Sequence, residues 1–184
     1  MTLLILGLLI FFAIHLLPSF STTRNNLYSR YGERRFKLGF TLIALVGLIL
    51  IIIGKAQADY IPIWEPPVWT RHMAMPFVML AFILLPAAHM PTNIKRFTPH
   101  PMLWGIILWS GAHLAANGDL ASMLLFGSFF VYSLFDIVSA NRRGAKTQDH
   151  KVPLRKDIMV VVAGLVVYGV FLFAHPWLFG RAII

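Results

Sequence analysis

Six apolar runs, each bounded by polar or basic residues, limit what this chain can fold into. A helix that spans a membrane needs about 20 mostly apolar residues, with about 17 as a lower limit. The runs meet or approach that length and cover residues 1–17, 36–54, 72–89, 101–116, 120–138 and 158–175. Because 58% of the residues are hydrophobic, a soluble domain of this size could not hold so much apolar surface in its interior. The sequence therefore predicts an all-α integral membrane protein, an antiparallel bundle of six transmembrane helices that forms a single domain over residues 1–184.

Two local features refine this bundle. Gly47 and Gly54 are seven residues apart and so lie on one helix face, where small residues let neighbouring helices approach closely in lipid. Asn117 and Gly118 separate the fourth and fifth runs, and both residue types tolerate the left-handed backbone conformation. Residues 117–119 are therefore predicted to form a tight left-handed turn between antiparallel neighbours.

The basic residues predict which way the bundle faces. With six spans, loops 18–37, 90–100 and 139–157 lie on one side of the membrane and hold 13 of the 16 basic residues: Arg24, Arg30, Arg34, Arg35, Lys37, Lys95, Arg96, Arg142, Arg143, Lys146, Lys151, Arg155 and Lys156. The opposite side has Lys55, Arg71 and Arg181. Positive residues stay cytoplasmic, so we expect a multi-pass protein of the bacterial inner membrane with both termini periplasmic. The basic residues that set this membrane orientation also account for the net charge of +9. We therefore expect no nucleic-acid partner.

Residue types that are missing or misplaced exclude several kinds of chemistry. The chain has no cysteine, which excludes disulfides, thiolate metal sites and covalently attached c-type haem. The seven acidic residues lie in loops or within about one turn of the predicted helix ends: Glu33, Asp59, Glu65, Asp119, Asp136, Asp149 and Asp157. A carboxylate di-iron centre or an acidic proton relay needs carboxylates deep in the bundle, so neither is expected.

The seven histidines are therefore the chemically capable set: His15, His72, His89, His100, His113, His150 and His175. His150 lies in a loop, and most of the others lie near span ends, where a histidine can reach water. His113 lies twelve residues into the fourth run, or ~18 Å along the helix. A polar ring at that depth should face the bundle and find a partner. The partner is either a backbone carbonyl, Asn117 or Ser110, or a group bound inside the bundle.

The surroundings of His113 leave both interpretations open. Trp109, one turn earlier, shares its face. Small residues leave room for a neighbouring helix or for a flat prosthetic group: Gly105, Gly111, Ala112, Ala115 and Ala116. Apolar walls, aromatic rings and one or two inward histidines are what a b-type haem requires. The same small residues also suit plain helix packing.

Depth along the helices complicates the choice of a second haem ligand. His15 lies near the cytoplasmic end of the first run, so its depth differs from that of His113 by ~10–15 Å. That separation is too large for one iron unless the first helix continues past Pro18 toward Ser21. The alternative ligands are His72, His100 and His175, of which His72 and His175 lie closer in depth to His113.

Several short motifs run in order along nearly the whole chain: Ile14-His15, Tyr31-Gly32-Glu33-Arg34-Arg35, His100-Pro101, Trp104-Gly105, Trp109, Ala112-His113, Ala116-Asn117-Gly118-Asp119 and Leu125-Phe126-Gly127. Together they resemble the NnrU family of bacterial inner-membrane proteins. This resemblance implies a role in denitrification, in the expression or function of nitrite and nitric oxide reductases. The family is also related to the 15-cis-zeta-carotene isomerase, a membrane enzyme that uses haem b.

The relation to the isomerase implies haem ligands in this chain. The isomerase's two principal haem-associated histidines correspond to His15 and His113, and we expect Trp109 and Asn117 to lie beside the cofactor. This chain departs from the isomerase at two positions. It has Ser110 where the isomerase has a cysteine, and it has no histidine near Tyr132, where the isomerase has another. Haem ligation by histidine is implied, whereas isomerase activity is put in doubt.

Three functions follow as hypotheses. The first is a haem b protein that supports denitrification through redox sensing, electron handling or haem delivery. The second is a haem-dependent cis–trans isomerase of a polyene such as zeta-carotene. The third is a cofactor-free assembly partner of a larger reductase. Membrane lipid, haem and a denitrification enzyme or electron-transfer partner are the expected partners.

Overall fold

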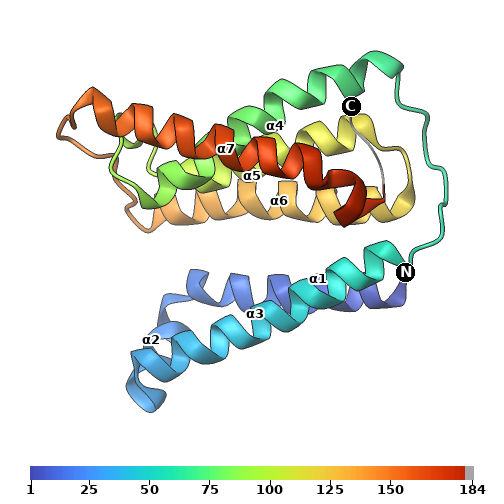
Figure 1. The fold of residues 1–184 in the computed structure, drawn as a ribbon. Coiled ribbons are helices and arrows are strands. Elements are labelled where there is room, and N and C mark those ends of the chain that lie inside the picture. The colour runs from blue at the N-terminus through green and yellow to red at the C-terminus, as the bar shows by residue number, and fades with distance from the viewer. Residues whose placement is uncertain (181–184) are drawn as a thin grey trace. The chain divides into compact units, whose positions relative to one another are not determined.

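The computed structural model describes residues 1–180, and this part of the chain is helical (Figure 1). In chain order the elements are α1 (Thr2–Leu16), η1 (Leu17–Ser19), α2 (Ser21–Tyr31), α3 (Glu33–Ala56), α4 (Val68–His89), η2 (Asn93–Arg96), α5 (Pro101–Ala116), α6 (Leu120–Arg142) and α7 (Leu154–Phe179). No β-strand occurs within residues 1–180, which confirms the all-α prediction. Arg181, one of the three basic residues predicted to be periplasmic, lies outside the described residues.

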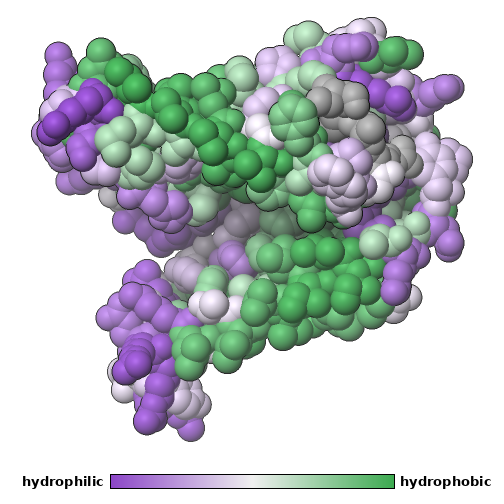
Figure 2. Space-filling model, viewed as in Figure 1, coloured by the Kyte–Doolittle hydropathy of each residue, from purple (hydrophilic) through white to green (hydrophobic). Residues whose placement is uncertain are grey.

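Five helical stretches among the described residues are long and apolar enough to cross a membrane: Thr2–Ser19, α3, α4, α6 and α7. The sixth predicted span, α5, has 16 residues and is about 24 Å long, less than the ~30 Å of a bilayer's hydrocarbon core. Hydrophobic residues cover the middle of the helices on the face shown in Figure 2, and hydrophilic residues gather at helix ends, notably at α2. These are the helices of a multi-pass membrane protein.

The helices extend beyond the apolar runs. α3 begins at Glu33, α6 continues to Arg142, and α7 runs from Leu154 to Phe179. A helix satisfies its own backbone hydrogen bonds, so it can continue from hydrocarbon into the polar interface without a change in backbone structure. Residues 21–31, predicted as part of a loop, form α2. Gly32, whose φ is +79°, then separates α2 from α3.

The chain divides into two compact units, each described here by itself. Unit 1 comprises Met1–Trp64 and Asp119–Ser128, and unit 2 comprises Glu65–Gly118 and the chain from Phe129 onward. The two units therefore alternate along the chain: the first segment of unit 2 interrupts unit 1, and α6 begins in unit 1 and ends in unit 2. The single domain expected from chain length stays a prediction.

In unit 1, α1 packs antiparallel against α3 through glycines. A Cβ atom added to Gly54 would lie 2.2 Å from the backbone nitrogen of Leu4, and one added to Gly47 would lie 2.9 Å from that of Phe11. Gly7 of α1 makes the same kind of contact from the other helix, because a Cβ added to it would lie 2.6 Å from the backbone nitrogen of Ile51. The prediction that Gly47 and Gly54 share a face that meets a neighbouring helix is confirmed.

In unit 2, α4 packs against both α5 and α7. At Gly164 of α7 a Cβ would lie 2.6 Å from Ile83 Cα, and at Gly105 of α5 one would lie 3.1 Å from the carbonyl oxygen of Ala81. α5 in turn contacts the second part of α6, where the rings of Trp109 and Phe129 meet edge to face. Neighbouring helices in this unit are again antiparallel.

Asp157 ties two loops of unit 2 together. Its Oδ1 accepts hydrogen bonds from Thr92 Oγ1 and from the backbone N–H of Asn93, each 2.7 Å long. Its Oδ2 accepts from Asn93 Nδ2, which also donates to the carbonyl of Val152. Thr92 is fully buried. The segment after α4 is thereby fixed to the start of α7.

The turn between α5 and α6 differs from the prediction. Asn117 has φ −128° and ψ 132°, which is extended, and no residue from 117 to 119 has a positive φ. The left-handed turn is therefore wrong. The reason is a distant pairing: Asp119 forms an antiparallel bridge with Pro62, and the Leu120 N–H donates to the carbonyl of Ile61 over 2.8 Å. Such pairing requires extended backbone.

The glycine contacts of unit 1 predict a matched pair of stability effects. Gly54→Ala should lower the free energy of unfolding by about 1–3 kcal/mol, because the new methyl group overlaps the backbone of Leu4. Gly39→Ala, in the same helix, meets nothing within 4 Å and should leave stability unchanged or slightly raised. Thermal unfolding of both variants in detergent, followed by circular dichroism, checks this. Equal effects of the two substitutions would contradict it.

Candidate functional site

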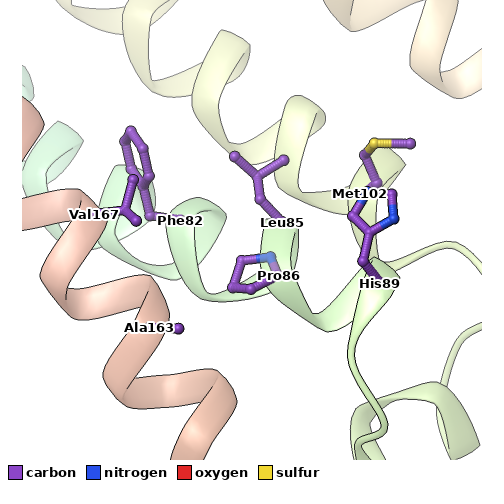
Figure 3. Close-up of a pocket in the computed structure, with 7 residues that line it drawn as sticks. All are labelled: Phe82, Leu85, Pro86, His89, Met102, Ala163 and Val167. Carbon is purple, nitrogen blue, oxygen red and sulfur yellow. The ribbon is translucent and has the colours of Figure 1, made fainter.

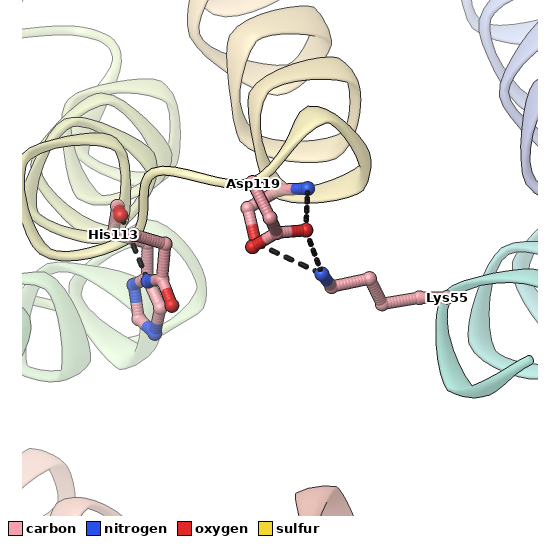
Figure 4. Close-up of polar contacts among 5 residues, drawn as sticks. Lys55, His113 and Asp119 are labelled. Atoms are coloured by element: carbon pink, nitrogen blue, oxygen red, sulfur yellow. Dashed lines mark hydrogen bonds and ion pairs between the residues drawn. The ribbon is translucent and has the colours of Figure 1, made fainter. Parts of the chain in front are cut away.

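His113 lies in the last turn of α5 and is half-buried. Its Nδ1 is 2.8 Å from the carbonyl oxygen of Trp109, one turn earlier (Figure 4). A carbonyl oxygen can only accept a hydrogen bond, so Nδ1 carries the proton. The neutral ring then has its lone pair on Nε2. Of the partners considered from the sequence, a backbone carbonyl is observed.

His15 has the same arrangement in unit 1. Its Nδ1 is 2.7 Å from the carbonyl oxygen of Phe11, so its lone pair is likewise on Nε2 when the ring is neutral. The ring stacks on that of Phe11 at 4.0 Å and meets Phe40 edge-on at 5.1 Å. Beyond His15 the chain stays helical through η1 to Ser19, so helical backbone continues past Pro18.

Histidines that ligate a metal characteristically donate the proton of their other nitrogen to a carbonyl or carboxylate, which fixes the tautomer and the ring orientation. His15 and His113 both meet this requirement. His100 is bound differently, because its Nε2 lies 2.8 Å from Asn141 Oδ1. His15 belongs to unit 1 and His113 to unit 2.

The residues expected beside a cofactor contact His113 directly. The ring centroids of Trp109 and His113 are 5.2 Å apart. The Asn117 side chain donates to the backbone carbonyl of His113 over 2.9 Å and so closes the end of α5. Ser110 is fully buried and donates to the carbonyl of Ile106 over 2.6 Å. Trp109 therefore orients the ring, and Asn117 holds the backbone that carries it.

The remaining histidines are dispersed. His72 and His89 are exposed near the two ends of α4, and His150 is exposed in the loop before α7. His175 is half-buried in α7, with its ring 4.8 Å from that of Phe179. Residues 1–180 contain no group of three or more histidine or acidic side chains that could hold a metal ion. A haem supplies four nitrogens of its own and needs one or two histidines, so the donor chemistry of His15 and His113 fits it.

The small residues near His113 serve helix packing in unit 2. Gly105 faces the α4 backbone at Ala81, and a Cβ on Gly111 would lie 3.4 Å from the ring of Phe130. Of the two interpretations of these positions, close helix contact is the one observed for Gly105 and Gly111. The fit to haem therefore depends on the histidines and their aromatic neighbours.

Comparison with family models gives a match to NnrU protein over residues 3–182. The chain belongs to the NnrU family. This match covers nearly its full length and confirms the resemblance carried by the motifs. No curated protein matches the chain, and no solved structure matches it either.

A polar cluster in unit 1 of this NnrU family member was not predicted. Lys55, at the end of α3, donates to Asp119 Oδ1 and to Ser122 Oγ, each over 2.9 Å (Figure 4). Asp119 also accepts from the Ser122 N–H over 3.0 Å and from the Ser122 hydroxyl. The carboxylate thus caps the N-terminus of α6, as an acidic residue at that position does, and pairs it with α3.

Burial raises the pKa of Asp119, but hydrogen bonds from Ser122 and Lys55 outweigh it and hold the pKa of this carboxyl below its usual range. One signal for the cluster was present in the sequence: an aspartate directly before an apolar run is a strong helix cap. Its pairing with Lys55, 64 residues away, carries no such local signal.

The Asp119 cluster predicts a pH-dependent contribution to stability. Because the folded pKa is lower than the unfolded one, the contribution is full above the unfolded value of about 3.9 and is lost as the pH falls through the folded value. Asp119→Asn should therefore destabilise the protein by about 1–3 kcal/mol at neutral pH and by less below about pH 4. Thermal unfolding in detergent across this range checks it, and a difference that stayed constant with pH would contradict it.

Proposed function

We propose that this NnrU family protein binds haem b in a bacterial inner membrane, in which His113 would ligate the iron and His15 is the second candidate ligand, and that it supports nitrite and nitric oxide reductases during denitrification. The observation that carries the proposal is the hydrogen bond from Nδ1 of each histidine to the carbonyl four residues earlier. It puts the lone pair of the neutral ring on Nε2, the nitrogen that can bind iron. Membership of the NnrU family supports the link to denitrification.

The residues around His113 define what the protein contributes to such a site. The Trp109 carbonyl holds the Nδ1 proton, and the Trp109 ring lies against the imidazole. Asn117 secures the end of α5. Phe129 of α6 meets Trp109 edge to face, so apolar rings lie beside the imidazole. A bound haem b would supply one-electron chemistry.

Redox sensing, electron handling or haem delivery suits this chain better than isomerase chemistry. Ser110 replaces the isomerase's cysteine, and its hydroxyl is bonded to the Ile106 carbonyl. Tyr132 stands where the isomerase has a further histidine. Two groups that distinguish the isomerase are therefore replaced by residues of different chemistry.

Absorption spectroscopy of the protein purified in detergent from haem-replete cells tests the proposal. The wild-type protein should show the Soret and reduced α bands of a b-type cytochrome. His113→Ala and His15→Ala should each lower the haem content per protein, because each variant removes one of the two imidazoles that would hold the iron. His150→Ala is the matched control and should keep the full spectrum, since His150 is exposed in a loop.

A colourless wild-type protein that is folded would contradict the proposal and favour the cofactor-free assembly partner. In a denitrifying host that lacks its own NnrU protein, the wild-type gene should restore nitric oxide reductase activity and the His113→Ala gene should not. Equal restoration by both genes would show that the role in denitrification does not require haem bound through His113.

The proposal includes a six-span topology with both termini periplasmic. α5 is short, but it is apolar and lies antiparallel to α4 within unit 2. The basic residues favour this topology, because nearly all of them fall in three loops that six spans would place on one side.

Because the chain has no cysteine, single-cysteine variants test the topology directly. A membrane-impermeant maleimide applied to cells with a permeabilised outer membrane should label Asp59→Cys and not Ala145→Cys. Both positions are exposed, so disruption of the inner membrane should make both react. Labelling of Ala145→Cys before that step would reverse the proposed orientation.

A further inference from the structure

Three helices of unit 2 line an apolar groove with a volume of about 290 Å³ (Figure 3). Its floor is the face of α4 from Phe82 to His89. Met102 of α5 forms one wall, and Ala163 and Val167 of α7 form the other. His89 is the one lining residue with a titratable side chain, and it lies at one end of the floor.

The groove is open to whatever surrounds the helices. Met102 is 43% exposed and Val167 is 42% exposed. The helices α4 and α7 are both long enough to span a membrane. Hydrocarbon surrounds such helices, and an apolar groove on them is filled most favourably by hydrocarbon. A lipid acyl chain is therefore the occupant that the lining selects.

The His89 end of the groove is basic. Lys156 precedes Ala163 by seven residues, two helical turns, and so lies on the same face of α7. The η2 helix, which contains Lys95 and Arg96, contacts both α4 and α7.

The nearest carboxylate along the chain, that of Asp157, accepts hydrogen bonds from Thr92 and Asn93 and keeps its negative charge. Lys95, Arg96 and Lys156 outnumber this one carboxylate, so this end of the groove has a net positive charge that can attract another anion.

We propose that this groove binds an anionic phospholipid, with one acyl chain between α5 and α7 and the phosphate near Lys156 and His89. The apolar lining of the groove adjoins its basic end, just as the acyl chain of a phospholipid adjoins the charged headgroup. Clusters of basic residues beside membrane helices favour anionic lipid by charge, and an ammonium group bonds a phosphate oxygen directly. This proposal does not depend on haem.

Native mass spectrometry of the full chain tests the charged end. The protein would be reconstituted with equal amounts of phosphatidylglycerol and phosphatidylcholine, and retained lipids counted after transfer to detergent. The wild-type protein should retain phosphatidylglycerol in excess. Lys156→Gln should reduce that preference about five-fold. Lys146→Gln, an exposed lysine in the loop before α7, is the control and should leave the preference unchanged.

A second pair of variants tests the apolar end. Ala163→Phe fills the groove and should abolish retention of both lipids, whereas Val166→Phe, exposed on α7 and outside the lining, should retain them. If Ala163→Phe unfolds, Leu85→Phe replaces it, with thermal unfolding as the check. The proposal is overturned if the wild type retains the two lipids equally, or if the groove-filling variant retains them unchanged. It is also overturned if the group that the groove-filling variant loses is not a phospholipid.

Discussion

Direct contact between helix backbones is the interaction on which each unit depends. In lipid, helices gain little from the hydrophobic effect, because the acyl chains are as apolar as the side chains. Van der Waals contact must replace it, and contact is closest where no side chain intervenes. Gly54 against Leu4 in unit 1 and Gly164 against Ile83 in unit 2 provide such contacts. The large aliphatic side chains of α3 and α7 are consequently left exposed to the surroundings.

Polar interactions complement this packing at the helix ends. Asp119 joins the end of α3 to the start of α6, and Asp157 joins the segment after α4 to the start of α7. Each carboxylate is bonded by several donors, so its charge is compensated where water is scarce. Asp119 and Asp157 thereby serve structure at the helix ends, and histidines are the polar groups that we propose for chemistry between the helices.

Regular local patterns in the sequence predicted most of the helices. Each apolar run corresponds to one helix, and α5 occupies the predicted residues 101–116. α2 was missed because its eleven residues are mostly polar and carry no apolar stripe. The left-handed turn at Asn117 was wrong because residues 61 and 62 pair with its far side, which local preference does not encode. For the candidate site, the sequence predicted that His15 and His113 ligate haem and that Trp109 lies beside it, and these roles stay predictions. The tautomers depend on side-chain rotamers that only coordinates reveal, and the Lys55–Asp119 pair joins residues too far apart to be predicted locally.

The Lys55–Asp119 pair also has a consequence for biogenesis. A ribosome completes α1 and α3 long before it reaches Asp119, and all of the first segment of unit 2, from Glu65 to Gly118, is made in between. During that interval the Lys55 ammonium lacks its carboxylate and the α1–α3 hairpin lacks the start of α6. Unit 1 is therefore incomplete in the membrane while the first segment of unit 2 is being translated. Unit 1 is completed before α7, the last helix of unit 2, has been made.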